Sequence, residues 1–125
     1  MSKEALRYLQ NAKELLSKSR IEDNRYEDIK YVREACSTTY LAILIAIDEY
    51  LIKHGVDEKK LPKSVDGYRE MLKKYVSVHN GKLTKEFETL YSKLHIAGYY
   101  RGLLKHVDMV RIALKSAKAF IEKIK

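Results

Sequence analysis

The sequence predicts an all-α fold, an antiparallel up-and-down bundle of four to five helices. Apolar residues recur at spacings of three and four along most of the chain, which places them on one face of a helix. The 125 residues include one proline and five glycines, so few positions interrupt long helices. The connections between the periodic segments are short, which favours antiparallel neighbours. We expect one domain over residues 1–125, because a chain of this length buries a single core.

The first predicted helix runs from about Lys3 to Ser19. Ser2 precedes it and is a suitable N-cap residue, and Glu4 favours the positive end of the helix dipole. One apolar stripe follows the helix, consisting of Leu6, Leu9, Ala12, Leu16 and Ser19.

The second predicted helix is the longest, from about Tyr26 to His54, and follows a polar loop with a turn signal at Asp23-Asn24. Its apolar seam consists of Ile29, Val32, Cys36, Tyr40, Ile43, Ile47 and Tyr50. Further apolar residues make this helix apolar on nearly all sides. It therefore lies at the centre of the bundle, or contacts both the core and a partner. Gly55 suits the C-terminal cap because glycine adopts left-handed angles without strain.

Two shorter helices follow. Ser64 is predicted to cap a third helix from about Val65 to Val78. Asn80-Gly81 indicates a turn, and Thr84 is predicted to cap a fourth helix. The apolar residues of the fourth helix are Phe87, Leu90, Tyr91 and Leu94.

The last predicted helix runs from about Leu103 to Ile124. Gly98 and Gly102 each disfavour helix by about 1 kcal/mol relative to alanine, so we expect a kink or short break before it. Across the bundle, the residues expected to be largely buried include Ile43, Ile47, Leu72, Leu90, Leu114 and Ile121.

Basic residues outnumber acidic ones by 25 to 17, which gives a net charge of +8. The excess is marked at the C-terminal end, which carries Arg101, Lys105, Arg111, Lys115, Lys118, Lys123 and Lys125 against two acidic residues. Two interpretations are open: a solvated helix face, or a surface that attracts an anionic partner such as RNA or a nucleotide.

Targeting and redox signals are weak. The N-terminus shows no apolar signal segment, and the longest apolar run, Tyr40 to Ile47, falls far short of the ~20 residues that span a bilayer. Cys36 is alone, so an internal disulfide is excluded and a buried small hydrophobe is expected. We expect a cytoplasmic protein that does not contact membranes.

No cofactor and no metal site are predicted. The histidines His54, His79, His95 and His106 are scattered, and neither His-x3-His nor Cys-x2-Cys spacing occurs. The Glu-x-x-His pairs of di-iron bundles and the glycine-rich phosphate loop are also missing from the sequence.

Three segments together resemble one family. An opening helix reads ALRYLQNAKELL, the long second helix reads REACSTTYLAILIAIDEYLIKHG, and the small-residue–tyrosine break at Ala97-Gly98-Tyr99 precedes ALKSAKAFIEKI. These segments are similar to those of HEPN-type helical bundles. The resemblance implies a helical bundle that often dimerises and that binds nucleotides or cleaves RNA without metal.

RNA-cleaving members of that family share an Arg-x4–6-His motif, which Arg101 and His106 match in this chain. The resemblance implies that the arginine clamps the scissile phosphate and the histidine moves a proton. In a continuous helix this spacing separates the two side chains by about 140°. Alignment on the Ala97-Gly98-Tyr99 break also places the motif arginine near Leu94, so the match is displaced.

Three functional hypotheses remain. The first is a non-catalytic interaction module that associates with a second copy or with another protein. The second is an RNA- or nucleotide-binding module that uses the basic C-terminal helix; its candidate residues are Tyr99, Tyr100, Arg111, Lys115 and Lys118. The third is a metal-independent ribonuclease that uses Arg101 and His106. We rank them in that order and lean against an enzyme.

Overall fold

A computed structural model of the chain describes residues 2–76 and 81–124. Within these residues the elements are α1 (Lys3–Ser17), β1 (Ile21–Glu22), β2 (Arg25–Tyr26), α2 (Ile29–Lys53), η1 (Glu58–Lys60), α3 (Val65–Met71), η2 (Leu72–Val76), α4 (Lys82–Leu90), η3 (Tyr91–Tyr100) and α5 (Val107–Lys123). The predicted helical bundle is therefore confirmed, with a small two-stranded sheet added. η1 is a 3₁₀ turn, and η2 and η3 are π-helical continuations of α3 and α4.

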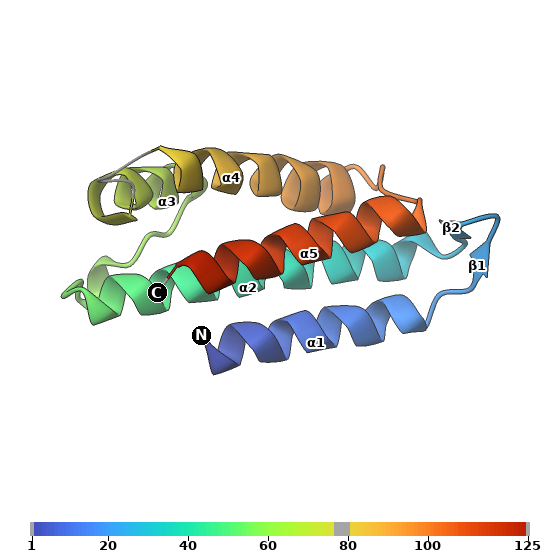
Figure 1. The fold of residues 1–125 in the computed structure, drawn as a ribbon, viewed down its shortest axis with the longest axis horizontal. Helices are drawn as coiled ribbons and strands as arrows, with labels where there is room; N and C mark the ends of the chain where they lie inside the picture. Colours follow the sequence, from blue (N-terminus) through green and yellow to red (C-terminus); the bar gives the residue numbers. More distant parts are fainter. Residues whose placement is uncertain (1, 77–80, 125) are drawn as a thin grey trace.

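The long helix α2 lies at the centre of the bundle. It packs against α1 on one side and against η3 and α5 on the others (Figure 1). The six side chains expected in the core, among them Ile43, Ile47 and Leu114, are all buried. α2 is also long and apolar enough to cross a membrane, with a mean hydropathy of 1.4 over its most apolar window. Half of that window is buried inside the bundle, which is typical of a core helix.

A β-hairpin separates α1 from α2 where the sequence predicted only a loop. Ile21 pairs with Tyr26 and Glu22 with Arg25. The two residues of its turn, Asp23 and Asn24, both have positive φ, at 51° and 60°. This is the conformation that short hairpins require and that Asp and Asn tolerate. The predicted turn is confirmed, but the hairpin was missed.

The hairpin also moves two helix boundaries. α1 ends at Ser17, and Ser19, expected in the helical stripe, lies buried in the connection. α2 begins at Ile29 behind the N-cap residue Asp28, so the predicted start at Tyr26 is wrong.

Several predicted caps can be compared with the structure. The hydroxyl of Ser2 accepts a hydrogen bond from the Ala5 amide, and that of Ser64 accepts one from the Gly67 amide, both at 3.0 Å. Gly55 has the expected left-handed backbone, with φ +94°. Thr84 was predicted wrongly, because Gly81 occupies the N-cap position of α4 and Thr84 lies inside the helix.

A few sequence predictions fall outside the described residues. The predicted end of the third helix at Val78, the Asn80 half of the Asn80-Gly81 turn, and His79 belong to this group.

Gly98 is in η3 for a packing reason. A Cβ atom at this position would lie 2.5 Å from the Sγ atom of Cys36 on α2. Glycine therefore lets the two helical segments approach each other closely. The predicted kink at Gly98 is wrong, because the helical path continues through it to Tyr100.

The break in the helical path comes later, at residues 101–106. Gly102 has a left-handed backbone with φ +62°, as suits the end of a helix. α5 then begins at Val107 rather than at the predicted Leu103. The prediction of a break near Gly102 is confirmed, although its extent was underestimated.

A candidate binding groove between α1 and α5

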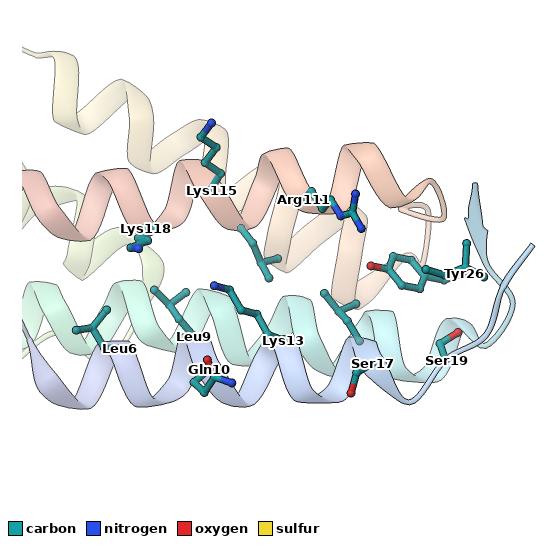
Figure 2. Close-up of a pocket in the computed structure, with 13 residues that line it drawn as sticks. Leu6, Leu9, Gln10, Lys13, Ser17, Ser19, Tyr26, Arg111, Lys115 and Lys118 are labelled. Carbon is teal, nitrogen blue, oxygen red and sulfur yellow. The ribbon is translucent and has the colours of Figure 1, made fainter. Parts of the chain in front are cut away.

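A groove of about 810 Å³ runs between α1 and α5 (Figure 2). It exists because α1 packs mainly along α2 and touches α5 only sparsely. The hairpin forms one end of the groove, through Ser19, Ile21 and Tyr26. We call this the hairpin end.

The floor of the groove is apolar. α1 presents Leu6, Leu9 and Leu16, and α5 presents Leu114. Leu9 and Leu16 also belong to the core, whereas the side chain of Leu6 is 36% exposed. The apolar face of α1 is therefore wider than the surface that the bundle buries, and Leu6 remains partly exposed.

The rim of the groove is cationic. Its charged residues are Lys13 on α1 and Arg111, Lys115 and Lys118 on α5, all exposed. None of the described residues that line the groove carries a carboxylate. Within the part of the chain that the structure describes, none of these four cations takes part in an ion pair. No described carboxylate therefore lies within ion-pair distance of these four cations.

The hairpin end holds a buried polar side chain, that of Tyr26, which is 8% exposed. The Tyr26 amide donates to the carbonyl oxygen of Lys105 at 2.9 Å, which fixes the backbone. The hydroxyl makes no hydrogen bond with any described residue. Burial raises the pKa of Tyr26, and the positive charge of Arg111 opposes part of that rise. The phenol therefore stays neutral and keeps its proton near neutral pH.

The lining of the groove combines apolar side chains with cationic ones. None of the described residues of the lining is a histidine, a cysteine or a carboxylate. An apolar floor between two cationic edges fits an elongated amphipathic molecule with negative charge.

Comparison with known proteins places the chain in a family. The whole length, residues 1–125, matches a family described as "Domain of unknown function (DUF5618)". The chain belongs to this family. A solved structure of a protein of unknown function from Dyadobacter fermentans is 32% identical in sequence, with a TM-score of 0.79. That match covers 97% of this chain and 90% of the other. None of the curated proteins matches the sequence.

In this DUF5618 domain, the predicted nucleic-acid residues divide into two groups. Arg111, Lys115 and Lys118 lie together along the groove. Tyr99 and Tyr100 do not line it; they stand at the end of η3, where their side chains are 43% and 70% exposed. The structure therefore brings the cations together and leaves the two tyrosines apart from them.

The two predicted catalytic residues lie on the non-helical connection between η3 and α5. Arg101 follows η3, and its amide donates to the carbonyl oxygen of Ile96 at 2.8 Å. His106 occupies the N-cap position of α5 and pairs with Arg25 in a short β-bridge. Both side chains are exposed, and no hydrogen bond between them is present among the described residues.

Cysteine chemistry and metal binding are two further candidate properties of this DUF5618 domain. Cys36 is buried, and burial raises the pKa of its thiol to about 12, so the reactive thiolate is strongly disfavoured. In residues 2–76 and 81–124, no three His, Cys, Asp or Glu side chains gather in a way that could hold a metal ion.

Sequence reasoning missed the groove because it assigned the apolar residues of α1 to the core and Tyr26 to a helix. One usable signal was present. The Asp23-Asn24 turn is flanked by Ile21 and Tyr26, whose side chains suit strands. A hairpin at this point would have removed Tyr26 from the second helix.

Proposed function

We propose that this chain is a non-catalytic, HEPN-like interaction module that binds an acidic amphipathic helix of a partner protein in the groove between α1 and α5. The observation that carries the proposal is an apolar floor beside four cations, with no ion pair to them and no carboxylate in the lining among the described residues. The HEPN-like part rests on the three sequence segments described above and is consistent with the helical bundle.

The dimensions of the groove support a helix as its occupant. On α1 the lining extends from Leu6 to Ser17, a distance of roughly 16 Å at the helical rise of 1.5 Å per residue. This corresponds to about three turns of a bound helix. A helix lying there would place apolar residues at i, i+3, i+4 and i+7 on the floor, and its flanking residues would face the cationic rim.

The charge of the groove favours a different protein over a second copy of this chain. Two copies that met groove to groove would bring two cationic rims together, and the chain as a whole carries +8. Like charges at an interface are unfavourable, whereas an acidic partner is attracted and oriented. Light scattering over a concentration series checks this choice, and we expect a monomer.

Binding can be tested with a fluorescent amphipathic peptide of about 14 residues. Leucines occupy one face and glutamates flank them, and a matched peptide carries glutamine in place of glutamate. We expect saturable binding of the glutamate peptide, weaker binding at higher salt, and little binding of the glutamine peptide.

Two protein variants locate the binding surface. Leu6→Glu places a charge on the apolar floor and should abolish binding. Leu41→Glu is the control, because Leu41 is 45% exposed on α2 and does not line the groove. Equal binding by both variants contradicts the proposal.

An RNA- or nucleotide-binding module is the second candidate. It is favoured by the gathering of Arg111, Lys115 and Lys118 along one edge of the groove. Single-stranded RNA would contact these cations through its phosphates and would not need the apolar floor. RNA binding that survives Leu6→Glu but falls in a Lys115→Gln, Lys118→Gln variant would favour this alternative.

A further inference from the structure

The hydroxyl of Tyr26 is accessible from the groove and makes no hydrogen bond with any described residue. Its side chain is 8% exposed, and its phenolic oxygen points into the groove (Figure 2). An accessible tyrosine hydroxyl can donate a hydrogen bond either to solvent or to a bound ligand. The rest of Tyr26 is buried, so packing holds the ring in place and a donor of fixed position faces the groove.

Arg111 reaches into the same end of the groove from α5. Figure 2 shows its guanidinium beside the phenol of Tyr26, above the floor formed by α1. Arg111 makes no ion pair among the described residues, and no carboxylate lines the groove. The hairpin end thus presents two kinds of donor, one neutral and one positively charged, and no described carboxylate lies against them.

We propose that the Tyr26 hydroxyl and the Arg111 guanidinium form an anion-binding subsite that takes a carboxylate of the bound acidic segment. This inference rests on the proposed function and specifies which end of the groove recognises charge. The phenol donates to one carboxylate oxygen, and the guanidinium donates to the other. Hydrogen bonds to an ionised acceptor are about twice as strong as neutral ones.

The subsite would give the bound segment a direction. Lys13, Lys115 and Lys118 are exposed, so their attraction to a carboxylate is screened by water and salt. At the hairpin end two donors, the Tyr26 phenol and the Arg111 guanidinium, can bind one carboxylate together, whereas each lysine offers a single ammonium group. The acidic residue therefore anchors the segment at the hairpin end, and its apolar face follows Leu16 and Leu9 toward the start of α1.

The test uses the whole protein and acetate as the probe. The NMR signal of the Arg111 Nε–H group is followed while sodium acetate replaces sodium chloride at constant ionic strength. We expect a saturable shift, and we expect Tyr26→Phe to weaken acetate binding roughly tenfold, because one hydrogen bond to a charged group is lost. Tyr8→Phe is the matched control, since Tyr8 is half-buried on α1 and does not line the groove.

The outcomes separate clearly. A linear shift without saturation, or equal acetate affinity in the wild type and in Tyr26→Phe, overturns the subsite. A parallel titration with inorganic phosphate checks the anion, and binding of phosphate without acetate overturns the assignment to a carboxylate. Tyr26→Phe should fold normally, because the ring is kept and the lost hydroxyl makes no hydrogen bond within the described protein.

The same variants distinguish this inference from the proposed function. If acetate saturates the wild type but the acidic peptide does not bind, the subsite stands and the helix-binding function fails. If the peptide binds the wild type and Tyr26→Phe equally and acetate does not saturate, the groove function stands and the subsite fails.

Discussion

The Nε atom of Arg33 on α2 donates a hydrogen bond to the carbonyl oxygen of Tyr99 at the end of η3, at 2.8 Å. A second donor of the same guanidinium, Nη2, reaches the carbonyl oxygen of Tyr100 at 2.7 Å. The last carbonyl groups of a helical segment have no partner within it, so Arg33 supplies donors from a residue far away in sequence. The fork of the guanidinium joins α2 to the point where η3 ends.

Replacing Arg33 should therefore loosen the end of η3. We expect Arg33→Ala to lower the free energy of unfolding by about 1 kcal/mol, the net value of a typical intramolecular hydrogen bond. Arg33→Lys should recover only part of this, because an ammonium group lacks the planar fork. Urea unfolding gives the measurement, with Lys30→Ala as an exposed control on the same helix. Equal effects of Arg33→Ala and Lys30→Ala contradict the assignment.

The contact between Gly98 and Cys36 should not tolerate an added methyl group. Gly98→Ala places Cβ 2.5 Å from Sγ and 2.9 Å from Cβ of Cys36, so the backbone of η3 has to move. Overpacking of this kind lowers stability by about 1–3 kcal/mol. Gly81→Ala is the control, because a Cβ there meets nothing within 4 Å.

A double-mutant cycle tests the partner of that contact. Cys36→Ala removes the nearer sulfur atom, so the combined variant should lose less stability than the two single effects added together. Additive losses in thermal or urea unfolding would show that Gly98 is constrained by something other than the sulfur atom of Cys36.

Asp48 should make the protein less stable as pH rises. A carboxylate in an ion pair has the opposite effect, because its pKa is lowered in the folded state. Burial raises the pKa of Asp48, and the hydrogen bond from the Tyr68 hydroxyl, at 3.0 Å, offsets part of this. The folded protein then binds a proton more tightly than the unfolded chain. Stability from this group is present at low pH and falls as pH rises from the ordinary carboxyl pKa through the raised one.

The variant Asp48→Asn removes this dependence and keeps an acceptor for the Tyr68 hydroxyl. We expect its stability relative to the wild type to increase as pH rises through that window, as measured by urea unfolding at several pH values. A constant difference between the two proteins across the window would contradict the raised pKa.

The ribonuclease alternative can be tested with His106. The two motif residues stand exposed on a non-helical connection without a hydrogen bond between them, so we expect no RNA cleavage that depends on them. The assay uses labelled single-stranded RNA with a metal chelator present. Chelator-resistant turnover in the wild type that disappears in both Arg101→Ala and His106→Ala would prove this expectation wrong and would make the protein an enzyme.

The parts of the fold that sequence predicted are those with local causes. Ile43 and Ile47 lie on the buried face that helical periodicity assigns to them, and Ser2 and Ser64 cap helices through bonds within their own turn. These features depend on residues a few positions apart, so a single sequence displays them.

The parts that escaped prediction depend on residues far apart in the chain. Gly98 suggested a kink, yet its role is set by Cys36, which is 62 positions away in the printed sequence. The groove arises because α1 and α5 pack closely with α2 and loosely with each other. No pattern of neighbouring residues in the sequence indicates how closely α1 and α5 pack with each other. Arg111, Lys115 and Lys118 were recognised as candidates from their charge, whereas Tyr26 was assigned to a helix.

The cationic rim and the apolar floor of the groove affect different rates of binding. The rim affects association, and the floor affects dissociation. Charges at a rim act over distance and raise the rate of encounter, and that rate falls as salt increases. Apolar contacts form only after docking, and differences in affinity among related complexes lie mostly in the dissociation rate. The association rate of a partner held by Leu9, Leu16 and Leu114 would therefore depend strongly on ionic strength. Its dissociation rate would depend on ionic strength only weakly.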